Sequence, residues 1–246
     1  MRLTVLGTCS PYPLPGRACP GYLLEVGGKT VLLDCGSGVA ERLLKFTDYD
    51  RLDAIVLSHL HGDHTSDMWV IRYAVDAYLR QGRRRGPLAV YAPPEPAAEF
   101  SLLPYKESFR VMAAGPGQDV DLGDGVTMSF LRTAHSLPCN AVTFRHGGAK
   151  FTYSADTSYT EEMANFAAGA DLFLCEATLQ ESVKEFTRLG HLTAVEAARL
   201  GQQARVKRLL LTHFTPELDA AVTEREARAT FRGVLQMAME EAVYEF

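Results

Sequence analysis

The feature that most constrains this chain is the stretch SHLHGDH at residues 58–64, which directly follows the apolar run LDAIVL. It places three imidazoles and one carboxylate within six positions, those of His59, His61, Asp63 and His64. Four such groups packed together without a cation would be hard to satisfy with hydrogen bonds alone. We therefore expect a metal site here rather than a polar loop that happens to be rich in histidine.

Side chains of the same kind follow three further strand-like runs. His135 follows VTMSFLRT, Asp156 follows AKFTYSA, and His213 follows KRLLLT. A lone histidine is more often a surface residue or a hydrogen-bonded core residue than a metal ligand. Loops converge at the carboxyl ends of strands, however, so the repeated placement predicts one shared site at that edge of a sheet.

The hydropathy pattern predicts a mixed α and β fold. Hairpin-like strands dominate the first half and helices alternate with strands later, which suggests two sheets packed face to face with helices outside. Thr193 and Glu196 form a capping box at the start of one helix. The segment 81–87, QGRRRGP, is expected to be a solvated charged loop. Strands are predicted at 2–6, 21–26, 29–34, 53–57, 88–92, 126–132, 140–145, 149–154, 171–175 and 207–212, and helices near 66–80, 160–168, 193–205 and 223–232.

Composition narrows the class of protein. The length of 246 residues and the 47% hydrophobic content fit a globular chain, which we expect to form a single domain over residues 1–246. Five cysteines without a CxxC pair support neither a zinc ribbon nor a dithiol redox motif. The net charge of -5 argues against a surface built as a whole to hold nucleic acid. Without a long apolar segment, a cytoplasmic protein that does not enter the membrane is expected.

SHLHGDH, with His135, Asp156 in SADT and His213 in LTHF, resembles the metallo-β-lactamase superfamily. The resemblance runs from GTCSPYP through LLDCGSG to LTHF and covers most of the chain. It implies an α+β fold, a four-layer αββα sandwich, with a dinuclear metal site at one edge. By this resemblance one metal is held by His59, His61 and His135, the other by Asp63, His64 and His213, and Asp156 bridges the two.

The ligand types indicate which metals and which substrates suit such a site. Imidazole and carboxylate ligands favour two divalent ions, with zinc expected and manganese or iron as alternatives. Two ions about 3.5–4 Å apart can share a water and lower its pKa from about 15.7 towards 7. Two ions carry four positive charges, and two aspartates and a hydroxide remove three of them. The remaining charge attracts an anionic substrate and stabilises negative charge that develops on its oxygens.

Further motifs resemble one branch of the superfamily. Zinc β-lactamases commonly carry cysteine at the position of Asp156. With aspartate there, the segment SADT resembles that of hydrolases acting on phosphodiesters or thioesters. GTCSPYP, CEAT at 175–178 and GHLTA at 190–194 resemble the ribonuclease Z group and its small relatives, which include cyclic-nucleotide phosphodiesterases. The candidate catalytic residues are Asp63, His191 and Glu176.

His191 and Glu176 can be given roles from chemistry as well. His191 lies just ahead of the helix capped by Thr193, where the helix dipole favours an anion. It could contact a phosphate oxygen or donate a proton to the leaving oxygen. Glu176 is the candidate partner that orients the ring and favours its protonated form. The alternative is that His191 only completes a loop and Glu176 is a structural acid. Asp34 in LLDCGSG is expected to brace a metal ligand from behind.

The spacing of the motifs favours a small substrate. Ribonuclease Z enzymes that process transfer RNA carry a long arm between the third histidine motif and the bridging aspartate. Here twenty residues separate His135 from Asp156, which is enough for a hairpin. We therefore expect a phosphodiesterase acting on a small anionic phosphodiester, such as a cyclic nucleotide. An RNA endonuclease like ribonuclease Z, a thioester or lactone hydrolase, and a metal-binding protein without turnover are the alternatives. Proteins of this kind are often homodimers, and that assembly stays open for this chain.

Overall fold

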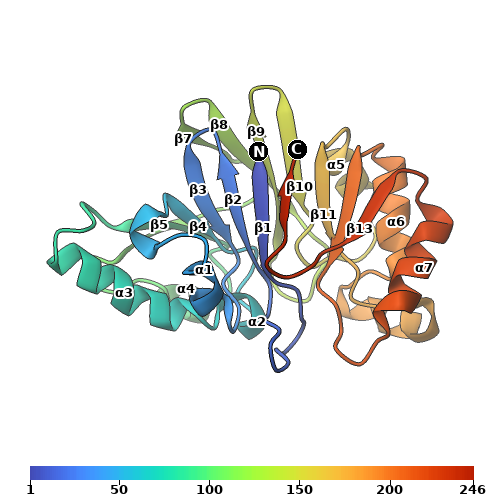
Figure 1. The fold of residues 1–246 in the computed structure, drawn as a ribbon, viewed down its shortest axis with the longest axis horizontal. Helices are drawn as coiled ribbons and strands as arrows, with labels where there is room; N and C mark the ends of the chain where they lie inside the picture. The colour runs from blue at the N-terminus through green and yellow to red at the C-terminus, as the bar shows by residue number, and fades with distance from the viewer.

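Two seven-stranded sheets packed face to face form the centre of the computed structural model, which describes residues 1–246 (Figure 1). The first sheet has the order β14-β1-β2-β3-β4-β5-β6 and the second the order β13-β12-β11-β10-β9-β8-β7. The strands of the first sheet are β1 (Arg2–Gly7), β2 (Gly21–Val26), β3 (Lys29–Leu33), β4 (Ala54–Val56), β5 (Leu88–Ala92), β6 (Phe109–Ala113) and β14 (Val243–Glu245). Those of the second are β7 (Asp119–Gly123), β8 (Val126–Arg132), β9 (Asn140–His146), β10 (Ala149–Tyr153), β11 (Leu172–Glu176), β12 (Arg208–Thr212) and β13 (Val234–Met237).

Helices cover the outer face of each sheet, which completes four layers (Figure 1). The helices α1, α3 and α4 lie against the first sheet, and α5, α6 and α7 lie against the second. The arrangement is the αββα sandwich expected from the sequence, in the α+β class. The helices are α1 (Val39–Leu43), α2 (Gly62–Thr65), α3 (Met68–Arg80), α4 (Ala97–Leu102), α5 (Glu161–Ala167), α6 (Ala194–Gln203) and α7 (Ala220–Thr230), with 3₁₀ segments η1 (Tyr49–Arg51) and η2 (Glu181–Leu189).

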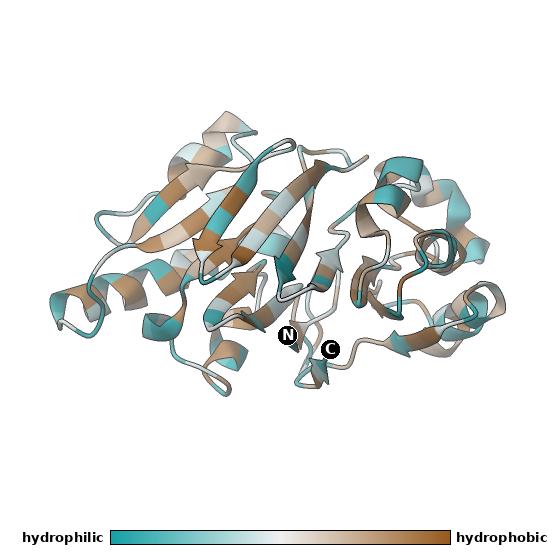
Figure 2. Cartoon of the chain, turned by 90° about the horizontal axis from the view of Figure 1, so that it is seen from above, coloured by the Kyte–Doolittle hydropathy of each residue, from teal (hydrophilic) through white to brown (hydrophobic).

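Three apolar clusters hold these layers together. The central cluster draws Tyr22 and Leu24 from the first sheet and Phe144 and Phe151 from the second, all essentially inaccessible to solvent. The two outer clusters lie between each sheet and its helices. Hydrophobic and hydrophilic residues alternate along several strands, as expected when one face of a strand is more buried than the other (Figure 2).

The direction of the strands decides where polar loops gather. Each sheet is antiparallel in one half and parallel in the other: β3, β4, β5 and β6 run parallel, and so do β10, β11, β12 and β13. The carboxyl ends of parallel strands share one edge, where their loops can converge on a common site. The segments that follow β4, β8, β10, β11 and β12 carry the residues singled out from the sequence.

All ten predicted strands and four predicted helices are present, within a few residues at each end. The four strands that sequence analysis missed are β6, β7, β13 and β14, which are the edge strands of the two sheets. An edge strand pairs on one side only and is often short or polar, as in DVDLG of β7. Its sequence therefore lacks the apolar run that marks a central strand.

The segment 81–87 is a loop, but its arginines are not simply solvated. The Arg84 guanidinium donates hydrogen bonds to the carbonyl oxygens of Tyr49, Asp50 and Leu52 at 3.5, 3.3 and 2.9 Å. Arg83 pairs with Asp48 and Asp50 at 2.7 and 3.0 Å. Arg83 is exposed, as expected for a solvated loop, although it is ion-paired. The expectation is wrong for Arg84, whose guanidinium is half-buried against the carbonyl oxygens of the η1 turn. The loop thereby fastens η1 to the end of α3.

The cysteines and the helices bear on two expectations drawn from composition. All five cysteines are buried free thiols, in agreement with the lack of any paired motif. None of the helices combines the length and the apolar character needed to cross a lipid bilayer.

Candidate metal centre

The seven predicted ligands meet at the carboxyl-end edge of the sandwich. They come from both sheets. The four ligands of the SHLHGDH motif follow β4 of the first sheet, and His135, Asp156 and His213 follow β8, β10 and β12 of the second. Their potential ligand atoms fall into sets that lie within 4.8 Å of one another. The sets are His59, His61, His135 and Asp156; Asp63, His64 and His213; and Asp156, His191 and His213.

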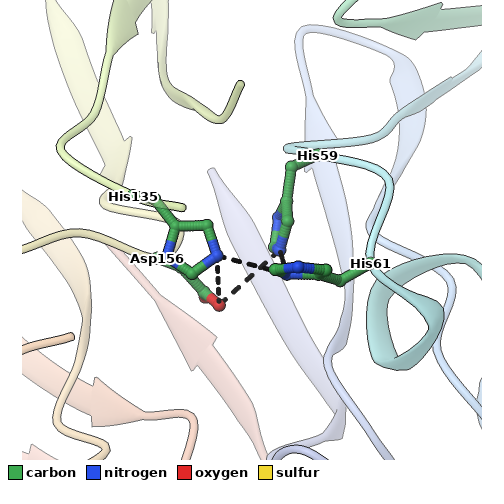
Figure 3. Close-up of side chains that lie close together, drawn as sticks. All are labelled: His59, His61, His135 and Asp156. Carbon is green, nitrogen blue, oxygen red and sulfur yellow. Dashed lines mark hydrogen bonds and ion pairs between the residues drawn. The ribbon is translucent and has the colours of Figure 1, made fainter. Parts of the chain in front are cut away.

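The side chains of the first set point toward one another (Figure 3). The Nδ1 atom of His61 lies 2.9 Å from Nε2 of His59 and 3.2 Å from Nε2 of His135. The Asp156 Oδ2 atom lies 3.7 Å from Nε2 of His59 and 3.9 Å from Nε2 of His135. Three imidazoles from two sheets thus point toward a single carboxylate oxygen.

The second set lies beside the first and shares Asp156 with it. The Nε2 atoms of His64 and His213 are 3.1 Å apart, and Asp63 Oδ2 lies 3.6 and 3.8 Å from them. The Asp156 carboxylate reaches this set too, with Oδ2 3.5 Å from His64 Nε2 and Oδ1 3.1 Å from His213 Nε2. Asp156 therefore lies within contact distance of ligand atoms from both sets.

Hydrogen bonds behind the rings fix which nitrogen points inward. His64 Nδ1 lies 2.8 Å from Asp34 Oδ2, and His135 Nδ1 lies 2.9 Å from the carbonyl oxygen of Gly190. Both partners accept only, so each Nδ1 must donate. In the neutral ring each Nε2 then carries a lone pair, the form that binds a metal. The expected bracing role of Asp34 matches its contact with His64.

Thr178 fixes the orientation of the His213 ring in the same way. Its hydroxyl donates to Glu176 Oε2, so its oxygen accepts from His213 Nδ1 at 2.7 Å. The Nε2 lone pair of His213 therefore faces the Nε2 lone pair of His64. Two lone pairs at this separation repel unless a proton or a cation lies between them.

The electrostatics of the site also favour a cation. Burial lowers the pKa of His59, His61 and His213 and so disfavours their protonated forms. Burial alone would raise the pKa of Asp156, but the imidazoles of His213, His64 and His59 hold it well below its usual value. Asp156 Oδ1 is buried and has no hydrogen-bond partner. An orphaned anionic oxygen among inward lone pairs fits divalent ions with nitrogen and oxygen ligands.

The pKa of His64 also indicates that the site favours positive charge. Burial opposes its protonation, yet the carboxylates of Asp156, Asp63 and Asp34 raise the pKa of its ring well above the usual value. Three acids around one ring therefore draw a proton to the place where a cation would otherwise sit.

Unusual backbone conformations accompany these contacts. Asp34, Ala155 and His213 have φ angles of 56°, 50° and 62°, in the left-handed region that side chains other than glycine seldom adopt. Each lies just beyond the end of a central strand. At Gly36 an added Cβ would lie 1.9 Å from the carbonyl oxygen of Asp63, so only glycine fits against the metal-motif segment. The chain thus turns sharply where it delivers side chains to the site.

His191 and Glu176 are in contact, as the sequence predicts. Glu176 is completely buried at the end of β11, and its Oε1 atom lies 3.2 Å from His191 Nδ1. Its oxygens also accept from the backbone N–H groups of Thr157 and Leu192 at 2.7 and 3.2 Å. Burial lowers the pKa of His191, but the Glu176 carboxylate outweighs this and raises it to about 9. The capping box of Thr193 and Glu196 forms directly after this histidine.

Sequence reasoning missed several residues that hold the site. Ser10 donates to Asp63 Oδ2 at 2.9 Å, and Tyr153 donates to Asp34 Oδ2 at 2.9 Å. Ser10 lies in the motif GTCSPYP, but nothing in that motif alone indicates a contact with Asp63. No local pattern marks Tyr153, since its partner belongs to the other sheet.

A cavity of about 450 Å³ opens onto the site. Its walls include His61, Asp63, Asp156 and His191 from the site and Tyr12 from the loop after β1. A substrate in this cavity can reach the shared carboxylate and His191 together.

Comparison with known proteins assigns the family. Residues 29–214 match the family model described as Beta-lactamase superfamily domain. The chain belongs to the beta-lactamase superfamily. It is 31% identical over 245 residues to "Probable metallo-hydrolase YhfI" of Bacillus subtilis, with all of both chains covered. The crystal structure of that protein matches with a TM-score of 0.94, at 30% identity, and covers 99% of this chain and 98% of the other.

More distant members of the superfamily include ribonucleases. Ribonuclease Z of Mycobacterium tuberculosis is 28% identical over 92% of this chain and 89% of its own. Human tRNase Z, short form, shares the fold with a TM-score of 0.77 at 23% identity, over 100% of this chain and 99% of the other. The chain is thus a metallo-hydrolase of the superfamily, with His and Asp clusters able to bind metal ions.

Proposed function

We propose that this chain is a single-domain, dinuclear metal-dependent phosphodiesterase that cleaves a small anionic phosphodiester such as a cyclic nucleotide. The observation that carries the proposal is the position of Asp156, within 4 Å of ligand nitrogens in both sets. A carboxylate so placed is suited to bridge two ions. One site is then His59, His61 and His135, the other is Asp63, His64 and His213, and zinc is the expected metal at both.

The residues that would hold the ions are already oriented for it. When bound, divalent ions lower the pKa of water to supply a nucleophile at neutral pH and neutralise charge on phosphate oxygens. Asp34 and Thr178 keep the Nδ1 protons of His64 and His213 directed outward. Ser10 holds the Asp63 carboxylate in place. The chain therefore has little to reorganise when metal enters.

His191 is the proposed acid. Its ring lines the cavity, and its protonated form is stabilised by the contact of Nδ1 with the buried Glu176 carboxylate. A protonated imidazole facing the cavity can donate a proton to the leaving oxygen of a phosphodiester. This oxygen needs the proton because it departs poorly as an alkoxide. Glu176 acts through His191 and is a positioning residue.

The size of the substrate is inferred from the chain between His135 and Asp156. Most of these residues form the strands β9 and β10, which are joined by the turn at Gly147 and Gly148. No arm extends from this hairpin to hold a large partner. The cavity of about 450 Å³ has the dimensions of a small-molecule site.

RNA cleavage is the second candidate function. It is supported by the similarity to ribonuclease Z of Mycobacterium tuberculosis along most of the chain. The absence of an arm in the β9–β10 hairpin argues for the smaller substrate. A homodimer, as in proteins that the motifs resemble, stays a prediction.

A substrate panel on protein of measured metal content tests the proposal. The panel contains cyclic nucleotides, bis(4-nitrophenyl) phosphate, pre-tRNA, a thioester, a lactone and a β-lactam. We expect metal-dependent hydrolysis of the small phosphodiesters, with about two ions per chain at full activity. Cleavage of pre-tRNA without action on small phosphodiesters would replace the proposal with the RNA alternative. Hydrolysis confined to the thioester or lactone would refute both.

A further inference from the structure

A second cavity, of about 330 Å³, opens beside His135. Three segments that follow different elements enclose it: residues 134–136 after β8, Ser158 after β10, and residues 188–190 at the end of η2. His135 is a proposed metal ligand, so this cavity adjoins the proposed reaction centre. The cavity of about 450 Å³ that contains His191 has none of these lining residues.

Hydrogen bonds tie the three walls together. The backbone N–H of Ser158 donates to the carbonyl oxygen of Ala134 at 2.8 Å, and the Ser158 hydroxyl donates to the carbonyl oxygen of Thr187 at 3.1 Å. The ring of His135 donates to the carbonyl oxygen of Gly190 at 2.9 Å. Gly190 has φ of 94°, and an added Cβ would lie 2.7 Å from His135 Nδ1, so this close approach requires glycine. The walls are therefore fixed relative to His135.

The charge of the lining is positive. Arg188 contributes a guanidinium and Ser136 a hydroxyl, whereas the Ser158 hydroxyl already donates to the Thr187 carbonyl oxygen. No carboxylate lines the cavity. Arg188 is exposed and takes part in none of the chain's ion pairs, whereas Lys184 on the same segment pairs with Glu181 at 3.9 Å. The Arg188 guanidinium is therefore free to meet an anionic group of a ligand. Guanidinium and hydroxyl groups together suit a phosphate.

We propose that this cavity, here named the Arg188 subsite (residues 134–136, Ser158 and 188–190), binds a second phosphate of the substrate, next to the phosphodiester that is cleaved. The inference rests on the proposed function and adds to it a preference, among small phosphodiesters, for nucleotides with more than one phosphate. A terminal phosphate on a short nucleotide and the next internal phosphate of an oligonucleotide offer the same chemistry.

Binding to the metal-loaded protein tests the subsite without turnover. Calorimetry compares thymidine 3′,5′-bisphosphate with thymidine 5′-monophosphate for the wild type, Arg188→Ala and Lys184→Ala. We expect the wild type to prefer the bisphosphate, and Arg188→Ala to reduce that preference about tenfold, as for one partly exposed charged hydrogen bond. Lys184→Ala, which removes a cation from the same segment outside the cavity, should keep the preference. Arg188→Lys should retain part of it.

The outcomes separate this inference from the proposed function. An equal preference in the wild type and Arg188→Ala would overturn the subsite, whatever the protein hydrolyses. Failure to hydrolyse bis(4-nitrophenyl) phosphate would instead overturn the proposed function. Turnover of a 5′-phosphorylated dithymidine and of a thymidine decamer distinguishes the two phosphate sources. Rates for the short substrate at least equal to those for the decamer would identify a terminal phosphate.

Discussion

Replacing Tyr153 by phenylalanine removes a hydrogen bond that joins the two sheets behind the proposed metal centre. Tyr153 belongs to β10 of the second sheet and is 1% exposed. Its hydroxyl donates at 2.9 Å to Asp34 Oδ2, which follows β3 of the first sheet and also accepts from His64. The substitution keeps the ring and therefore the packing of the central cluster.

The expected loss follows from the surroundings of Asp34. This carboxylate is fully buried and accepts from four donors, namely the N–H and hydroxyl of Ser58, His64 Nδ1 and the Tyr153 hydroxyl. A hydrogen bond to a charged group contributes about 1.5–3 kcal/mol, and no water replaces it at a closed position. We expect Tyr153→Phe to lower the free energy of unfolding by about 2 kcal/mol. In a chain of this size that corresponds to a fall in Tm of about 4–8 °C.

Tyr22→Phe is the matched control. Tyr22 is also completely buried between the sheets, and its ring centroid lies 5.2 Å from that of Tyr153. Its hydroxyl bonds to the neutral hydroxyl of Thr212 at 2.8 Å, and its removal should cost about 1 kcal/mol. Urea unfolding of both metal-free variants at pH 7, followed by circular dichroism, gives the comparison. A loss in Tyr153→Phe no larger than in Tyr22→Phe would show that the Asp34 contact contributes no more than an ordinary hydroxyl pair.

Three further predictions concern the site and the surface. His61→Ala should lose metal content and activity together; full metal occupancy measured by plasma mass spectrometry would remove His61 from the ligands. His191→Ala should retain metal while kcat falls about 10²–10⁴-fold, the usual contribution of a general acid, and normal turnover would exclude this role. At Asp48, hydrogen bonds from Tyr78 and Arg83 outweigh burial and lower the pKa of the carboxyl below 3.8. The stability it contributes is therefore present above pH 3.8 and is lost as the pH falls toward its folded pKa. Asp48→Asn should be less stable than the wild type at pH 7, with the gap closing in acid unfolding titrations.

The interior strands could be predicted from sequence because each buries an apolar run. The run LDAIVL and the alternating VTMSFLR locate β4 and β8 without knowledge of their partners. The edge strands could not be predicted in this way. In β14, VYE buries only Tyr244, so its pairing with β1 depends on a strand more than two hundred residues away.

In the site, too, the residues of a local motif could be predicted from sequence, whereas contacts with residues far along the chain could not. His59, His61, Asp63 and His64 form a dense motif that is recognisable by itself. The contacts that orient them involve common residues far along the chain, such as Tyr153, 119 positions from Asp34. Nothing in the neighbourhood of a buried tyrosine indicates that its hydroxyl meets a carboxylate of the other sheet.

The proposed ligands belong to stretches that lie far apart in the chain, since His64 and His213 are separated by 149 positions. Ions held among them would cross-link the two sheets at one edge of the sandwich, an arrangement that the unfolded chain cannot offer. Free metal at a hundred times its dissociation constant would then favour the folded state by about 2.7 kcal/mol. The amount of folded protein in a cell or on a purification column would accordingly follow the concentration of free metal around it.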